Sequence, residues 1–364
     1  MIGRRALAGL IGAGLILPAS TLALGQAPPA GPPRFAPVRP GSRLRFPADH
    51  GAHPDFRTEW WYVTGWLRAG AQTLGFQITF FRTRPAIDQA NPSAFAPRQV
   101  IFAHAALSDP TVGQLIHAQK IARAGFGLAE AKTGDLDLVL DDWRMSRNAA
   151  DVLHARAGDE RFTLDLQLTP SQPVLLQGDA GFSRKGPEPE QSSYYYSWPH
   201  LKVAGALTRE RRRVAVSGEA WLDHEWSSTL LDARAVGWDW VGLNLEDGGA
   251  LTAFQVRDAD GRAVWAGGSL RTGAGEVSIF KPDDVRFVTR SWWRSPRTGA
   301  RYPIARDIEV RTSRGRRTWR LVPLFEDQEL DSRPIGPVYW EGAVSGDGAR
   351  GYLELTGYEA PLAL

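Results

Sequence analysis

Cysteine is missing altogether from the 364 residues, and methionine occurs only twice. Without cysteine the chain has no disulfide framework, no thiolate nucleophile and no cysteine-ligated zinc. Serine is common, but the Gly-x-Ser-x-Gly elbow does not occur, which argues against a serine hydrolase. The glycine-rich phosphate loop and the dinucleotide fingerprint are missing as well. We therefore expect no cofactor.

The N-terminus has the layout of an export signal. Residues 1–25 carry Arg4 and Arg5 near their start, continue with an apolar stretch from Ala6 to Leu17, and end in the expected cleavage site Ala23-Leu24-Gly25. This layout predicts a cleaved signal peptide and a periplasmic or secreted protein, exported by the twin-arginine or the Sec route. A disordered or membrane-anchoring N-terminus is the alternative interpretation.

A strong excess of positive charge is also missing from the mature chain. Residues 1–25 hold two arginines and no acid, so cleavage lowers the formal net charge from +3 to +1. Only the short run at 209–213 is markedly basic, and a nucleic-acid partner is not expected. Residues 26–41 are rich in proline and lack periodicity, which indicates an extended linker.

What the sequence does have is alternation of apolar and polar residues. In the segment 161–170 every second residue is apolar, the period of a strand with one buried face. Turn residues such as Asp247-Gly248-Gly249 are typical of hairpins between antiparallel strands. No window of a dozen residues shows a helical period. We predict an all-β fold, with further strands within residues 73–83, 212–226, 241–261 and 306–324.

Tryptophan is unusually abundant, with 14 in the chain. Two Trp-rich segments, TEWWYVTGWL at 58–67 and GWDWVGLNLEDG at 237–248, are each followed by alternating strands. The mature chain is also long for a single β domain. We therefore predict two barrel-like domains, residues 42–227 and 228–364. Their Trp-rich strands are expected to face each other or to line the barrel interiors.

Six blocks along the chain carry a family resemblance: FPADHGAHPDFRTEWWYVTGWL (46–67), FAHAALSD (102–109), YYYSWPHLKVAGAL (194–207), GEAWLDHEWSS (218–228), GWDWVGLNLEDG (237–248) and YWEGAVSGDGARGYLELTGY (339–358). By these blocks the chain resembles the AttH and carotenoid 1,2-hydratase-type lipocalin-like proteins. The resemblance implies two tandem calycin-type antiparallel β-barrels, the first larger than the second. It also implies an apolar ligand, since relatives include hydratases of isoprenoid double bonds and pericyclases that fold polyene chains.

The resemblance also bears on catalysis. In the hydratases a histidine-bearing motif precedes a proline, but here tyrosines 194–196 stand ahead of Pro199, while the acid of the later block is retained as Asp223. A carboxyl group in an apolar pocket keeps its proton, and indole faces stabilise a carbocation. The predicted catalytic residues are Asp223, His224 and Glu59. Alternatively, Glu59 pairs with Arg57 or a strand neighbour and the indoles only fill a barrel.

The aromatic residues of these blocks, with one histidine, are the predicted ligand-binding residues: Trp60, Trp61, Tyr62, His104, Tyr195, Trp198, Trp221, Trp226, Trp238 and Trp240. His104 could equally be a hydrogen-bonded core histidine. Side chains that can coordinate a metal ion also occur together, at Asp49, His50, His53 and Asp55. The glycine and proline around them favour a solvated turn, so we predict no metal site.

Three functions from different classes fit these observations. The first is a secreted or periplasmic protein that binds an apolar, isoprenoid or lipid-like ligand, in the service of an ABC-type transport system in the membrane. The second is a lyase that adds water to an isoprenoid C=C bond. The third is a structural envelope protein with solid barrels. An open cavity containing Asp223 would favour the lyase, whereas filled interiors would leave only the structural protein.

Overall fold

The computed structural model describes residues 34–87, 91–229 and 231–362. The predicted signal peptide and residues 26–33 of the predicted linker lie outside these residues. The described part is built from antiparallel strands, with two short 3₁₀ turns, η1 (Ala48–His50) and η2 (Pro282–Asp284). The predicted all-β fold is therefore confirmed. No helix of the described residues is long and apolar enough to cross a membrane.

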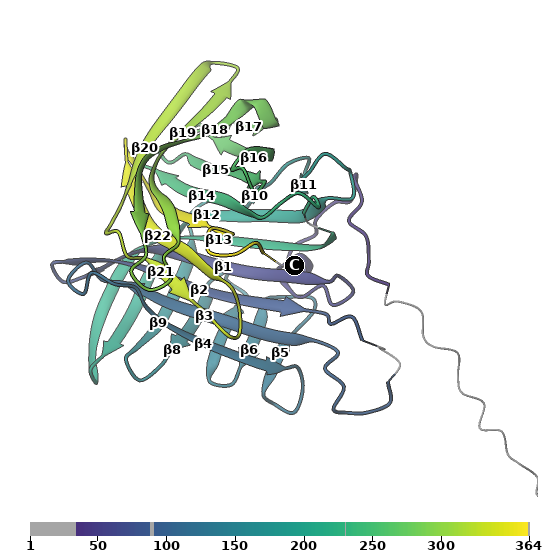
Figure 1. The fold of residues 1–364 in the computed structure, drawn as a ribbon. Coiled ribbons are helices and arrows are strands. Elements are labelled where there is room, and N and C mark those ends of the chain that lie inside the picture. The colour runs from purple at the N-terminus through teal and green to yellow at the C-terminus, as the bar shows by residue number, and fades with distance from the viewer. Residues whose placement is uncertain (1–33, 88–90, 230, 363–364) are drawn as a thin grey trace, which may run out of the picture.

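The strands form two large sheets, drawn in purple to teal and in green to yellow in Figure 1. Among the described residues the first sheet has thirteen strands and curls into a nearly closed barrel. Its order is β4 (Ile116–Arg123), β3 (Val100–Ser108), β2 (Gln72–Thr83), β1 (Thr58–Ala69), β13 (Arg212–Thr229), β12 (Ser192–Arg209), β9 (Phe162–Pro170), β8 (Leu153–Gly158), β7 (Trp143–Arg147), β6 (Asp137–Leu140) and β5 (Ala129–Ala131). The short β10 (Leu175–Leu176) and β11 (Phe182–Arg184) also pair with β12.

The second sheet has ten strands within the described residues. Its order is β17 (Val277–Phe280), β16 (Ala263–Arg271), β15 (Ala250–Arg257), β14 (Gly237–Leu245), β23 (Ala349–Leu355), β22 (Val338–Gly346), β20 (Gly315–Pro323), β19 (Arg301–Thr312) and β18 (Val285–Arg294), with β21 (Glu329–Asp331) beside β22. This sheet also curls, because β16 contacts β18 and β17 contacts β19. The first sheet ends at Thr229 and the second begins at Gly237, but the exact domain boundaries stay a prediction.

The two Trp-rich segments occupy equivalent places in the two sheets. β1 pairs with β2 and with β13, the last strand of its sheet, while β14 pairs with β15 and with β23, the last strand of its own. The predicted Asp247-Gly248-Gly249 turn joins β14 to β15, and Gly248 has a φ of +82°, which favours glycine. Each Trp-rich strand thus links the beginning and the end of its sheet.

Alternation along the strands produces three buried layers. The apolar residues of β9 at 162, 164, 166 and 168 all point into the first sheet, as the sequence predicts. A second core lies inside the curl of the second sheet. The third layer lies where the two sheets pack face to face, and we call it the seam. Its apolar members include Tyr62, Trp66, Trp221, Trp240 and Tyr352.

Candidate functional site

Strand alternation separates the residues of the Trp-rich strand β1. Trp61 and Val63 belong to the core inside the first sheet, and Glu59 lies on the same face because it is two residues from Trp61. Trp60 and Tyr62 lie on the opposite face and pack in the seam. The aromatic residues of this one strand therefore serve two separate environments, and each has its own polar cluster.

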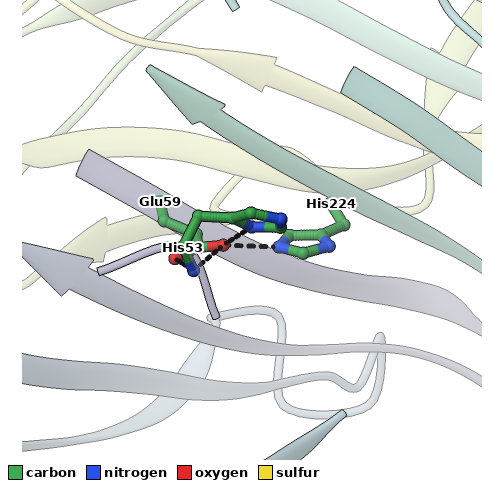
Figure 2. A group of neighbouring side chains, drawn as sticks. All are labelled: His53, Glu59 and His224. Carbon is green, nitrogen blue, oxygen red and sulfur yellow. Dashed lines mark hydrogen bonds and ion pairs between the residues drawn. The ribbon is translucent and has the colours of Figure 1, made fainter. Parts of the chain in front are cut away.

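Inside the first sheet, the Glu59 carboxylate is completely buried and binds three cationic or imidazole side chains, of which Figure 2 shows the two histidines. Its Oε1 lies 2.7 Å from Nδ1 of His53 and 2.9 Å from Nε2 of His224. Its Oε2 accepts a hydrogen bond of 2.6 Å from Nε of Arg82, which is itself buried. We call His53, Glu59, Arg82 and His224 the histidine cluster.

The other members of the histidine cluster keep the Glu59 carboxylate ionised. Burial alone would raise the pKa of Glu59, but the hydrogen bonds from His224 and His53 and the Arg82 guanidinium hold it well below its usual range. Burial would likewise lower the pKa of His53, yet its bonds to Asp49 and Glu59 raise it. The pKa of His224 is lowered, chiefly by burial. An ionised Glu59 accepts protons and does not serve as an acid.

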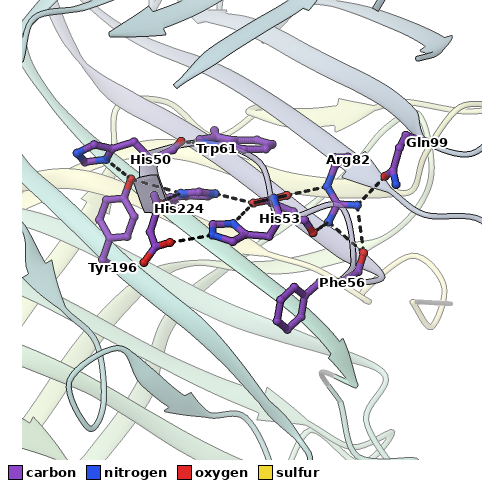
Figure 3. Close-up of polar contacts among 10 residues, drawn as sticks. His50, His53, Phe56, Trp61, Arg82, Gln99, Tyr196 and His224 are labelled. Atoms are coloured by element: carbon purple, nitrogen blue, oxygen red, sulfur yellow. Dashed lines mark hydrogen bonds and ion pairs between the residues drawn. The ribbon is translucent and has the colours of Figure 1, made fainter. Parts of the chain in front are cut away.

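The segment before β1 is held against this cluster (Figure 3). The main-chain carbonyl of His50 accepts a hydrogen bond from Nε1 of Trp61, and the carbonyl of His53 accepts one from Arg82. The His50 ring is buried, lies 2.7 Å from the Tyr196 hydroxyl and stacks on Trp198. The predicted solvated turn is therefore wrong for His50, because aromatic neighbours from β12 cover it.

The predicted set of possible metal ligands is only partly assembled. Asp55 is exposed, with 87% of its side chain accessible. A different group, His53, Glu59 and His224, brings its donor atoms within 4.8 Å of one another. A metal ion needs free lone pairs on its ligands, but Oε1 of Glu59 already accepts from two imidazoles and Oε2 from Arg82. The geometry fits a hydrogen-bonded charge cluster better than a metal centre.

Asp223 lies on the opposite face of β13 from its neighbour His224, in the seam. Its carboxyl group is buried and accepts hydrogen bonds from Ser197 Oγ at 2.5 Å, Trp221 Nε1 at 2.7 Å and Tyr195 Oη at 2.8 Å. Burial raises the pKa of Asp223 from 3.8 to about 7, although the three hydrogen bonds lower it. The predicted catalytic residues thus separate, with Glu59 and His224 inside the first sheet and Asp223 between the sheets.

Other predicted ligand-binding residues gather around Asp223. Trp240 of β14 donates a hydrogen bond of 3.0 Å from its Nε1 to the Tyr195 hydroxyl. Trp238 donates one of the same length to Glu354, whose pKa burial raises to about 7. Asp223 and Glu354 therefore keep protons near neutral pH in the seam, surrounded by indole and phenol rings.

A cavity of about 220 Å³ lies at one end of the seam, beside Trp221. Its walls come from β1, β13, β14 and β23 and from Thr73 of β2: Thr64, Gly65, Trp66, Leu67, Arg68, Thr73, Gly218, Glu219, Ala220, Trp221, Asn244, Arg350 and Gly351. Asp223 is two residues beyond Trp221 on the same face of β13 and is not itself in the lining. Trp66 forms one wall, whereas Trp60 and Trp61, which we predicted to bind ligand, are not in the lining.

The remaining predicted ligand-binding residues lie elsewhere. Trp198 and Trp226 belong to the core inside the first sheet, where Trp226 stacks on His53 with ring centroids 3.8 Å apart. His104 is buried between the sheets, with Nδ1 2.8 Å from the Tyr339 hydroxyl, and burial lowers its pKa to about 3. This environment matches the core-histidine alternative for His104. None of the three lines the cavity.

Sequence reasoning missed Arg82, Ser197 and Arg350. A signal for Arg82 existed, because the hairpin of β1 and β2 pairs Glu59 directly with Arg82. Ser197 stands two residues after Tyr195 on β12, so alternation alone would have placed it on the same face as that tyrosine. Nothing in the sequence sets Arg350 beside Trp66, because the two residues come from different sheets.

Comparison with known proteins decides the family. The family model described as AttH-like matches residues 37–358, nearly the whole described chain. The chain belongs to the AttH-like family. A crystal structure of an AttH protein from Nitrosomonas europaea is 53% identical, with a TM-score of 0.82, and the match covers 89% of this chain and 100% of that one. No curated protein matches the sequence.

Two more distant structures share the fold. Kievitone hydratase from Nectria haematococca is 13% identical, with a TM-score of 0.65 over 88% of this chain and 95% of that one. CghA, solved with Sch210972, is 12% identical, with a TM-score of 0.54 over 83% of this chain and 87% of that one. At such low identity these likenesses show the lipocalin-like AttH fold and nothing about activity.

Proposed function

We propose that this AttH-like protein is a periplasmic or secreted binder of an apolar, isoprenoid or lipid-like ligand, which it holds between its two sheets. The observation that carries the proposal is the cavity of about 220 Å³ between the indoles of Trp66 and Trp221. Concave sites with aromatic walls and a few polar groups are the usual binding sites for small apolar molecules.

The size of the cavity limits what can bind. Typical small-molecule sites measure roughly 300–1,000 Å³, so the 220 Å³ here fits a short apolar molecule or one end of a longer chain. The interiors of the two sheets are filled by large buried side chains such as Trp61 and Trp340. The seam is accordingly the better candidate for the ligand site.

Quenching of tryptophan emission by a brominated alcohol tests this proposal. Bromoundecanol should quench the tryptophan emission of the unmodified protein. Trp66→Leu should weaken its binding about tenfold, the loss of affinity expected when one buried aromatic side chain is truncated. Trp292→Leu is the matched control, because Trp292 is 49% exposed on β18 of the second sheet. Equal binding by both variants would show that the ligand does not bind in the cavity. No binding at all would favour the structural-protein hypothesis.

Export and a transport partner belong to the same proposal. Residues 1–25 carry the signal layout described above, and an exported carrier of an apolar ligand could hand it to an ABC-type transport system. Fractionation of cells tests the route. The R4K/R5K variant should stay in the cytoplasm if export is by the twin-arginine route, and should be exported normally if it is by Sec. Ligand-dependent cross-linking to a membrane transport component would test the partner.

Asp223 favours a second candidate function, the hydration of an isoprenoid C=C bond. A carboxyl group with a pKa of about 7 is half protonated at neutral pH and can act as an acid. Its proton would pass to one alkene carbon, water would add to the cation at the other, and the excess proton of that water would return to the carboxylate.

The Asp223→Asn variant separates binding from hydration, since asparagine resembles the protonated acid but cannot deliver its proton. If the protein is a hydratase, turnover should fall by roughly 10²–10⁴ while ligand affinity changes little. Turnover by the unmodified enzyme should also decline as the pH rises through about 7. Unchanged activity per folded molecule of the variant would leave Asp223 a structural role only.

A further inference from the structure

The lining of the cavity shows which kind of apolar molecule it suits. We infer, on the basis of the proposed ligand site, that the ligand is an amphipathic anion. Its carboxylate or phosphate head is held by Arg68 and Arg350, and its apolar body lies against Trp66 and Trp221. Both arginines line the cavity and both are exposed, as the mouth of a binding site requires.

The two guanidinium groups have no acidic partner within the described residues. No carboxylate in the described part of the chain lies within 4 Å of Arg68 or Arg350, whereas the buried Arg82 is bound to Glu59. The one acid in the lining, Glu219, is already paired, because its Oε1 lies 2.8 Å from Nδ1 of His200. Two guanidinium groups against one carboxylate in the lining leave the mouth with a net positive charge.

The contacts of Arg350 keep it close to the apolar wall. Its guanidinium lies over the Trp66 ring, 5.6 Å from the ring centroid, and Nε1 of Trp66 donates a hydrogen bond to the carbonyl of Gly351. These contacts join β1 of the first sheet to β23 of the second at the cavity. A guanidinium can make two parallel bonds to a carboxylate or phosphate through its planar edge.

The arrangement also gives the ligand an orientation. The charged head would stay at the exposed arginines, where water still reaches it, because burying an ion without full compensation is costly. The apolar body would then extend inward to Trp221, whose Nε1 donates to Asp223. The end of the ligand farthest from its head would be the part nearest to the acid.

A matched pair of quenchers tests the head group: bromoundecanoic acid and bromoundecanol differ only there. We expect the acid to bind the unmodified protein about five- to tenfold more tightly than the alcohol, with a preference that shrinks at high salt. The double variant Arg68→Ala/Arg350→Ala should lose this preference and bind the acid no more tightly than the alcohol. The control Arg212→Ala/Arg286→Ala removes the same charge from exposed positions away from the cavity and should keep the preference.

The outcomes separate the inference from the proposed function. Equal affinity for acid and alcohol in the unmodified protein would overturn the anionic head while leaving apolar binding intact. Binding of neither would overturn the proposed function and the inference together. Bromoundecyl phosphate, run beside the acid, distinguishes a phosphate ligand from a carboxylate ligand. Single Arg350→Gln and Arg68→Gln variants, each expected to lose part of the preference, serve if the double variant does not fold.

Discussion

Each sheet encloses one buried carboxylate near the start of its Trp-rich strand, but different groups neutralise the two. In the second sheet Asp239 of β14 accepts hydrogen bonds from Nε of Arg257 at 2.8 Å, Nη2 of Arg306 at 3.0 Å and the Tyr358 hydroxyl at 3.0 Å. In the first sheet Glu59 of β1 binds only one guanidinium, that of Arg82, and two imidazoles.

The difference bears on how each cluster responds to pH. Arginines stay charged at every physiological pH, so the Asp239 cluster is a fixed structural unit. Imidazoles change charge near neutral pH, and His53 belongs to the segment before β1 rather than to the sheet. The histidine cluster therefore fastens an irregular segment across the first sheet, and we expect its contribution to stability to depend on pH.

The largest expected effect is at Asp239. Asp239→Asn leaves Arg257 and Arg306 as buried cations without a full counter-charge, and such a loss costs about 3–5 kcal/mol of unfolding free energy. Urea unfolding should give the same loss at pH 6 and pH 9, because both arginines keep their charge. Asp260→Asn, which removes an exposed ion pair with Arg262, is the control and should cost less than about 1 kcal/mol. A strongly pH-dependent loss of stability in Asp239→Asn would show that the arginine cluster is not fixed in charge.

Glu59→Gln should cost less than Asp239→Asn, about 2–3 kcal/mol. Arg82 would keep other acceptors, namely the carbonyls of His53 and Phe56 and Oε1 of Gln99. His53 can also lose its proton, so the loss should shrink as the pH rises. Urea unfolding across pH 6–9 measures both effects. A loss equal to that of Asp239→Asn at every pH would show that the imidazoles make no difference.

The fold was predictable because the physical signal was local. The period of two along β9 and the glycine turn between β14 and β15 each follow from a few adjacent residues. The same period should have separated Asp223 from His224, because neighbours on a strand point to opposite faces. We grouped them by their nearness in sequence, and the structure places them in different layers.

The rest of the site depended on information that no short segment holds. Both faces of β1 are aromatic and buried, so its sequence does not reveal that Trp61 faces the core and Trp60 the seam. The cavity needs Trp66 from one sheet and Arg350 from the other, and only the packing of the two sheets brings them together. His53 lies in a segment without a period, which gives no direction for its ring.

The smallest expected effect is at His53, and it tests the pH dependence directly. The pKa of His53 is raised in the folded protein, since its bonds to Asp49 and Glu59 outweigh burial. The stability that its proton supplies is therefore fully present below the unfolded pKa of about 6.5, and it is lost as the pH rises through the folded value. His53→Gln should lower the unfolding free energy by about 1–2 kcal/mol at pH 6 and by less at pH 9. His154→Gln, which removes a 47% exposed histidine paired with Asp165, should cost less than about 1 kcal/mol at either pH. If the His53 variant lost the same stability at pH 6 and pH 9, the histidine cluster would be as fixed as the arginine cluster of the second sheet.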